Sequence, residues 1–227
     1  MSTRDRWFAA AVLGGLAAVL VSAVIALGWG RKNVSPPDLT ETPNPAIPGQ
    51  VLYVDADSCL ILADASGAAR RQVACTGVVP AGVYLPDAAT VAYLDPRPSP
   101  GRLVVLNAAD GSQLDVRTVA ETAFPGVPTA PDGTEAYARS DGRVQLLRDG
   151  KELAVLAFDD VEWGPRPLGW SPDSQWLVLA YDHPRKSATE LWIVSRDGTV
   201  RGTIANDASG AGIAWRIEGV GTWPPVP

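Results

Sequence analysis

The chain has 227 residues, 46% of them hydrophobic and 19% charged, and a formal net charge of −6. This length allows one or two domains, and 22 Gly and 20 Pro residues favour many short strands and turns. Residues 1–32 carry a local charge of +3, so the remaining 195 residues carry −9. A surface this acidic repels phosphate backbones, and we therefore expect no nucleic acid among the partners.

A charge-free apolar stretch follows the short N-terminal tail, 1–6, and runs from Trp7 to Trp29. As a helix these residues span roughly 33 Å, about the thickness of a hydrocarbon core. Residues 7–30 are therefore predicted to form a single-pass transmembrane helix in contact with the lipid bilayer of the cell membrane. The alternative is a cleaved signal peptide with its cleavage site at 26–28, although the apolar region of such a peptide is normally shorter.

Two further expectations concern this helix. Most of the chain follows it, so we expect the C-terminal domain to lie outside the cytoplasm. Small residues also recur at every fourth position and predict a face for packing against another helix. They are Ala10, Gly14, Ala18, Ser22 and Ala26.

The segment 31–49 is rich in proline and has almost no apolar periodicity, which predicts an extended linker. We expect the folded domain to occupy residues 50–227. Within it, Pro86-Asp87, Pro131-Asp132 and Pro172-Asp173 begin similar stretches that are 45 and 41 residues apart. A less regular copy lies at 47–55.

Each copy predicts the same series of strands and turns. Pro fixes the backbone at the start of a turn, and the Asp side chain accepts a hydrogen bond from the backbone two residues on. Two strands and a Gly-containing turn follow, with Asp-Gly typical of a type I′ hairpin, and a third strand comes after the turn. In the last copy we expect strands at 175–181 and 190–195, both with apolar residues on two faces. The turn glycines are Gly67, Gly111, Gly150 and Gly198.

A period of 40 to 45 residues with several strands per unit is typical of β-propeller blades. The stretch "WSPDSQWLVLAYDHPRKSATELWIVSRDGT" resembles the Pro-Asp repeats of periplasmic TolB-like propellers and of prolyl oligopeptidase propeller domains. This resemblance implies an all-β, propeller-like domain of about four blades and carries little information on activity. The blades would form either a ring whose C-terminal run shares a sheet with the first repeat, or an open arc completed by another subunit. A β-sandwich built from the same hairpins is the alternative.

Cys59 and Cys75 are placed symmetrically about Gly67, the centre of the first hairpin loop. This symmetry, together with the expected location outside the cytoplasm, predicts a disulfide bond with a Cα separation of about 4.4 to 6.8 Å. The chain has a single His, so the two thiols have no plausible partners for a zinc site.

Other polar groups are better explained by structure than by chemistry. His183 and Ser171 could belong to a hydrolytic triad, but a loop and a turn account for them. The acidic stretches 55–58 and 158–162 lack the pattern of a calcium loop. We therefore predict no catalytic, cofactor-binding or metal-binding residue and no enzymatic activity.

Six Trp residues lie beyond the apolar segment. Trp163 and Trp223 stand in Pro/Gly-rich context and are predicted partner contacts. The others, Trp170, Trp176, Trp192 and Trp215, are expected to pack between blades. The tether, the repeats and the acidic surface together predict a binding or scaffold protein, an accessory subunit of an envelope complex. A ligand-sensing regulator acting through a partner membrane protein is one alternative, and a hydrolase or lectin-like enzyme is another.

Overall fold

The computed structural model describes residues 31–34, 44–119, 127–158, 164–182 and 189–227. This part of the chain is all-β, as predicted. It contains no helix long and apolar enough to cross a bilayer. The predicted transmembrane segment, 7–30, and its proposed helix-packing residues lie outside the described ranges.

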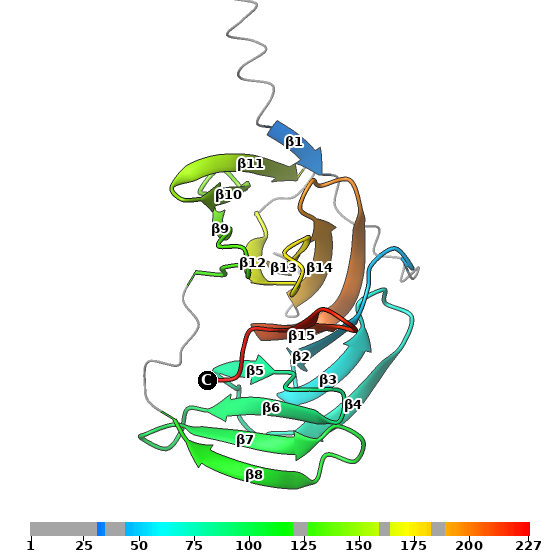
Figure 1. Cartoon of the computed structure of the whole chain (residues 1–227), viewed down its shortest axis with the longest axis vertical. Coiled ribbons are helices and arrows are strands. Elements are labelled where there is room, and N and C mark those ends of the chain that lie inside the picture. Colours follow the sequence, from blue (N-terminus) through cyan, green and yellow to red (C-terminus); the bar gives the residue numbers. More distant parts are fainter. Residues whose placement is uncertain (1–30, 35–43, 120–126, 159–163, 183–188) are drawn as a thin grey trace, which may run out of the picture.

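Four antiparallel units succeed one another along the chain (Figure 1). The first unit contains β2 (Gln50–Asp55), β3 (Cys59–Asp64) and β4 (Arg70–Cys75). The second contains β5 (Gly82–Tyr84), β6 (Thr90–Asp95), β7 (Arg102–Asn107) and β8 (Gln113–Thr118). The third contains β9 (Glu135–Ala138), β10 (Val144–Arg148) and β11 (Lys151–Phe158), and the fourth contains β12 (Arg166–Trp170), β13 (Trp176–Asp182) and β14 (Thr189–Ser195).

One long strand, β15 (Arg201–Ile217), joins the fourth unit to the first. Its N-terminal part pairs with β14, and its C-terminal part pairs with β2, from Ile213 opposite Tyr53 to Arg216 opposite Gln50. The C-terminal run therefore shares a sheet with the first repeat, a feature that the prediction had tied to the closed ring. A short final strand, β16 (Gly221–Trp223), pairs with the other edge of β15.

The predicted linker, 31–49, contributes to the fold more than expected. Strand β1 (Arg31–Val34) pairs in parallel with β11 at the edge of the third unit. The end of the linker packs on the domain, because Ile47 is buried between the first and fourth units. The backbone N–H of Asn44 also donates to the carbonyl of Ser66 at 2.7 Å. Packed structure therefore begins before Gln50.

Apolar residues on both faces of the inner sheets hold neighbouring units together. Tyr53 and Trp215 belong to the core between the first and fourth units. Trp170 and Trp192 belong to the core between the third and fourth units. A third core joins the first unit to the second and contains residues of β2, β3, β5, β6 and β7. These positions confirm that Trp170, Trp192 and Trp215 pack between units.

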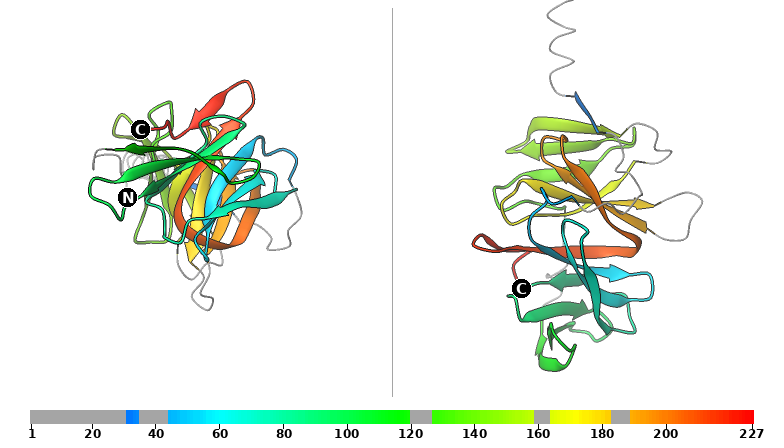
Figure 2. Two further views of the ribbon diagram at one scale, coloured as in Figure 1. Left: turned by 90° about the horizontal axis from the view of Figure 1, so that it is seen from below. Right: turned by 90° about the vertical axis from the view of Figure 1, so that its right-hand side faces the viewer.

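The four units form an open arc. The second and third units lie at opposite ends of the molecule in both side views (Figures 1 and 2). Among the described residues, no apolar cluster contains side chains from the strands of both units. The structure therefore favours the predicted open arc over the closed ring, and it differs from a two-sheet sandwich.

The Pro-Asp segments form the turns that the sequence predicted. In each, a carboxylate oxygen of the Asp accepts a hydrogen bond from the backbone N–H two residues on, at 2.8 Å for Asp87 and at 3.0 Å for Asp132 and Asp173. The predicted hairpin of the fourth unit is also confirmed, with Trp176 opposite Ser195. Alternate residues of β13 enter the two adjoining cores, as expected of a sheet with two apolar faces.

The Gly-containing turns differ from the prediction in one respect. All four turn glycines have positive φ, but only Asp149-Gly150 has positive φ at both positions, 51° and 72°. This turn connects β10 and β11 by the shortest loop of the four. Longer loops distribute the chain reversal over more residues, so they need only one residue in the left-handed region.

Candidate binding site

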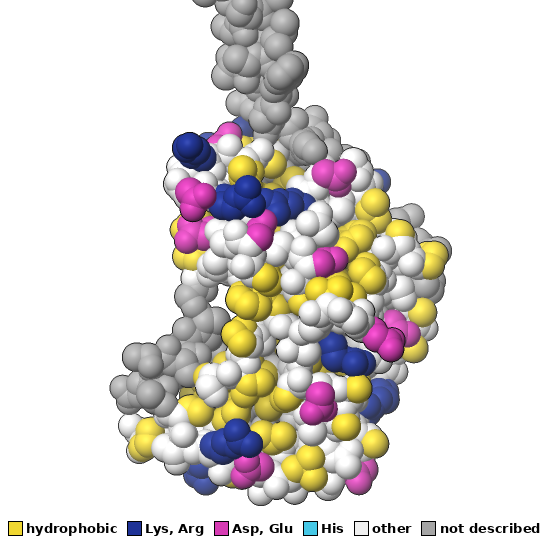
Figure 3. Space-filling view, viewed as in Figure 1, with side chains coloured by type: hydrophobic (Ala, Val, Ile, Leu, Met, Phe, Trp, Pro, Cys, Tyr) yellow, Lys and Arg dark blue, Asp and Glu magenta, His cyan; other side chains and the backbone are white. Residues whose placement is uncertain are grey.

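Segments of the second, third and fourth units and the shared strand β15 meet at one cavity of about 280 Å³, here called the axial cavity. Its walls come from β5, from the segment before β9, from β12 and from β15, and the C-terminal segment completes them. Hydrophobic side chains also gather between the two ends of the face shown in Figure 3. The lining residues are Gly82, Val83, Tyr84, Val127, Pro128, Thr129, Leu168, Gly169, Gly212, Ile213, Trp223, Pro224, Pro225 and Pro227.

Glycine allows the strands around the axial cavity to approach one another closely. A Cβ atom on Gly169 would lie 2.7 Å from Cγ2 of Ile213, closer than real Cβ contacts allow. A Cβ atom on Gly212 would lie 4.0 Å from the Cα atom of Gly82, and the φ of Gly212 is +133°. The sequence therefore uses glycine at 169 to bring β12 and β15 together, and at 212 for a backbone conformation that L side chains rarely adopt.

The side chains that line the axial cavity are uncharged. No Asp, Glu, Lys or Arg is among the described residues that line the axial cavity. Tyr84 lies in the wall, and its burial raises the pKa of its phenol above the usual value. The phenol therefore stays neutral at physiological pH, and the wall suits an uncharged, largely apolar ligand.

Two indole groups fix the segment before β9. Trp170 Nε1 donates to the carbonyl of Pro128 at 3.1 Å, and Trp223 Nε1 donates to the carbonyl of Thr129 at 2.9 Å. Trp170 is fully buried, whereas Trp223 is partly exposed in the cavity wall. Of the two predicted partner contacts, Trp223 thus lies at the cavity, and Trp163 lies outside the described residues.

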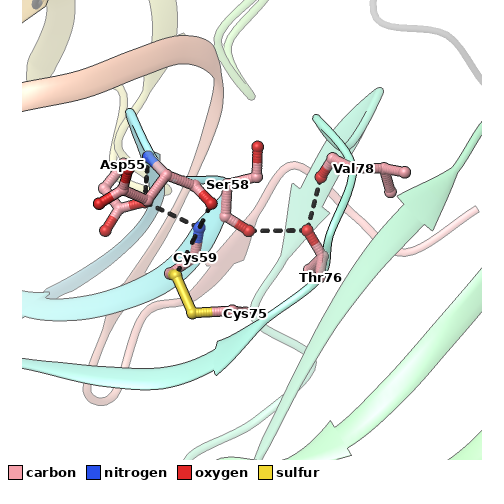
Figure 4. The surroundings of a disulfide bond; sticks show 7 residues. Asp55, Ser58, Cys59, Cys75, Thr76 and Val78 are labelled. Carbon is pink, nitrogen blue, oxygen red and sulfur yellow. Dashed lines mark hydrogen bonds between the residues drawn. A yellow bond between two sulfur atoms is a disulfide. The ribbon is translucent and has the colours of Figure 1, made fainter.

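The predicted disulfide is present, and it is separate from the axial cavity (Figure 4). Cys59 on β3 is directly opposite Cys75 on β4, with Cα atoms 3.8 Å apart. This separation is shorter than the predicted 4.4 Å minimum. The turn before Cys59 is held by Asp55, whose carboxylate accepts from the N–H of Cys59 at 2.8 Å. The bridge therefore fixes one end of the first hairpin.

The other polar residues considered from the sequence have structural roles or lie outside the described ranges. The Ser171 hydroxyl donates to Asp173 and accepts from the backbone N–H of Trp176, which is a turn arrangement. Asp55 also holds a turn, because its carboxylate accepts from the backbone N–H groups of Asp57 and Cys59. His183 and most of the acidic stretch 158–162 lie outside the described residues. Within the described ranges, no three His, Cys, Asp or Glu side chains gather as metal ligands would.

A charged cluster joins the third and fourth units away from the axial cavity. The Asp132 carboxylate accepts from Arg196 Nη1 at 2.6 Å and from Arg148 Nη1 at 3.2 Å. Arg196 also donates to the buried hydroxyl of Thr134 at 2.8 Å. Partial burial opposes ionisation, but the hydrogen bonds from Arg196 and Thr134 outweigh it and lower the pKa of Asp132 to about 2. Asp132 therefore acts as an ionised link between the two units.

Sequence reasoning missed the axial cavity in part because two of its walls come from very short segments. β5 has three residues, and the strand before β9 is represented by one isolated bridge, Thr129 to Glu135. Such segments show no alternation of apolar and polar residues. The sequence feature that could have indicated these segments is the recurrence of Gly and Pro just before each apolar run.

Solved structures similar to this chain include TolB proteins. TolB from Acinetobacter baumannii is 16% identical with a TM-score of 0.27, covering 79% of this chain and 50% of that chain. A putative TolB from Agrobacterium tumefaciens is 18% identical with a TM-score of 0.29, covering 73% and 68%. Hydrazine synthase from Kuenenia stuttgartiensis is 21% identical with a TM-score of 0.28, covering 74% and 53%.

The chain spans about half the length of the hydrazine synthase chain and of the Acinetobacter TolB chain. No protein-family model matches the sequence, and no curated protein matches it either. Similarities this weak do not assign a family or an activity.

Proposed function

We propose that the protein is a membrane-anchored binding module outside the cytoplasm, which holds an uncharged, apolar part of an envelope protein in the axial cavity. The observation that carries this proposal is the convergence of β5, β12, β15 and the segment before β9 on one apolar cavity. A cavity of about 280 Å³ is at the lower end of the range for ligand sites, so it suits one or two side chains of a larger partner.

The backbone around the cavity supports an extended partner segment. β5 pairs with β6, and β12 pairs with β13. In the order of the sheets each of the two is a terminal strand, so one edge of each has no strand hydrogen-bonded to it among the described residues. Open strand edges accept extended chains through backbone hydrogen bonds, and the apolar cavity between them would select the side chains.

The anchor and the acidic surface support the location. The apolar segment 7–30 is long enough to span a bilayer and precedes the folded part of the chain. The negative charge beyond residue 32 keeps the domain away from anionic headgroups.

A pull-down with two matched variants tests the binding role. Val127 lines the cavity and is 44% exposed, and Leu114 on β8 is 55% exposed and lies outside the cavity. A carboxylate at either position should leave the fold intact, because both side chains already contact solvent. We expect a stoichiometric partner from solubilised membranes to be reduced at least about tenfold by Val127→Asp and retained by Leu114→Asp. Equal recovery with both variants, or recovery of a lone monomer, would contradict the proposal.

Carbonate extraction tests the anchor. The full chain should stay in the membrane pellet, because the apolar segment spans the hydrocarbon core. A soluble mature protein that begins near residue 29 would show that the segment is a signal peptide.

A further inference from the structure

The C-terminal segment Trp223–Pro227 occupies one side of the axial cavity. β16 pairs with β15, and the chain then continues along the cavity, with Pro224, Pro225 and Pro227 in the wall. The segment therefore shows which kind of chain the cavity accepts: an aromatic residue followed by prolines.

Trp223 provides the first attachment of this segment. Its indole packs against the core between the third and fourth units, and its N–H donates to the carbonyl of Thr129 at 2.9 Å. An aromatic ring with one hydrogen-bond donor, seated at an apolar wall, is a typical anchor in recognition sites.

Val226 provides the second attachment, at the opposite end of the arc. It packs against Tyr84, Leu94 and Leu103 of the second unit. The segment thus contacts the two units that do not share an apolar cluster with each other.

Residues 224–227 are weakly attached to the rest of the domain. Three of them are prolines, which have no backbone N–H to donate. Residues 224–227 make no hydrogen bond with the described part of the chain. Pro225 and Pro227 are exposed, and Val226 is only partly buried. A segment held mainly by two side chains can exchange with an external segment of the same chemistry.

We propose that the axial cavity recognises extended proline-rich segments with a leading aromatic residue, and that Trp223–Pro227 is a built-in competitor for such a segment. This inference rests on the proposed binding function and specifies its partner chemistry. A partner segment would place its aromatic ring at the Thr129 carbonyl and its prolines along the wall, after displacing the chain's own segment. Proline-rich chains are pre-extended, so they lose little conformational entropy on binding to an aromatic-lined surface.

A synthetic peptide tests this competition directly. The probe is a fluorescent peptide of residues 218–227, EGVGTWPPVP, titrated against the full chain in mild detergent and followed by anisotropy. Trp223→Ala removes the first attachment and should release the segment. Val220→Ala is the matched control, because Val220 precedes β16, is 54% exposed and does not line the cavity.

We expect the peptide to bind Trp223→Ala at least about tenfold more tightly than the wild type and Val220→Ala. A competitor that occupies the site 90% of the time weakens the apparent affinity about tenfold. A second variant, Val226→Asp, keeps the indole but loosens the distal attachment and should also gain affinity. Adding Val127→Asp to Trp223→Ala should abolish binding, which would locate the peptide in the axial cavity.

Three results would overturn the inference: no binding to either loosened variant while circular dichroism shows both folded, equal binding to the wild type and the variants, or binding that is insensitive to Val127→Asp. The first would show that Trp223–Pro227 is a fixed part of the fold, and the second that this segment does not compete with the peptide. The pull-down described above is independent of this peptide. A partner lost with Val127→Asp, combined with no peptide binding, would leave the binding function standing and reject only the proline-rich chemistry.

Discussion

Replacing Trp215 by alanine should remove the principal contact between the first and fourth units. Trp215 is fully buried, and its indole N–H donates to the carbonyl of Pro48 at 3.0 Å. Truncating a buried Trp to Ala costs about 3–5 kcal/mol, and losing the hydrogen bond adds about 1 kcal/mol. The sum of roughly 4–6 kcal/mol is a large part of the 5–15 kcal/mol that stabilises a typical domain.

Urea unfolding of the chain in mild detergent, followed by far-ultraviolet circular dichroism, measures this loss. Trp223→Ala is a suitable control because Trp223 is partly exposed, and it should lose only about 1–2 kcal/mol. Trp215→Phe should be intermediate, because the ring volume is largely kept while the hydrogen bond is lost. A loss below about 2 kcal/mol for Trp215→Ala, or equal losses for both alanine variants, would refute the view that this core holds the arc together.

Three further predictions concern other parts of the fold. Because the folded-state pKa of Asp132 is lowered to about 2, its stabilisation is complete above pH 4 and is lost between about pH 4 and pH 2. Between these pH values the free energy of unfolding of the wild type should fall by about 1–2 kcal/mol, a figure that allows for solvent screening. The Asp132→Asn variant should lack this decrease. A loss of the same size in both would contradict the role of Asp132. Reducing the bond between Cys59 and Cys75 should lower the free energy of unfolding by about 3 kcal/mol, whereas the double alanine variant should not respond to reductant. Unchanged stability on complete reduction would mean that pairing of β3 and β4 suffices without the bond. Gly169→Ala should cost about 1–3 kcal/mol because its methyl would meet a buried isoleucine, and Gly101→Ala, where the nearest contact is an ordinary 3.4 Å, should cost much less in the same unfolding assay. Equal effects of the two substitutions would show that the strands around the cavity separate easily.

Strong local patterns account for what could be predicted from the sequence. The run from Trp176 to Asp182 is apolar on both faces, so both its strand character and its position between two cores follow from alternation alone. The Pro-Asp and Gly turns follow from backbone preferences of single residues. The disulfide followed from the symmetry of one hairpin, although its Cα separation lies below the predicted range.

The candidate site could not be predicted, because its residues become neighbours only after four units assemble. Tyr84, Thr129, Leu168 and Ile213 lie far apart in the sequence and line the same cavity. The inner strands are short and contain Gly and Pro, so they lack any periodic signal. The sequence did suggest a role for Trp223 through its Pro/Gly-rich context. Its attachment to Thr129 of the same chain depends on the path of the final residues, which no local pattern specifies.

The sharing of β15 between two units determines the order in which the chain can fold. Gln50 and Arg216, joined by a side-chain hydrogen bond, are 166 residues apart in the sequence. During synthesis, β2 therefore emerges long before its partner and presents an unpaired edge beside an incomplete core. Assembly of the first unit has to wait for residues 213–216, and the entropy of closing so long a loop makes this step slow. Chains interrupted upstream of Ile213 should consequently be prone to aggregation and open to proteolysis, even though most of their hairpins are already encoded.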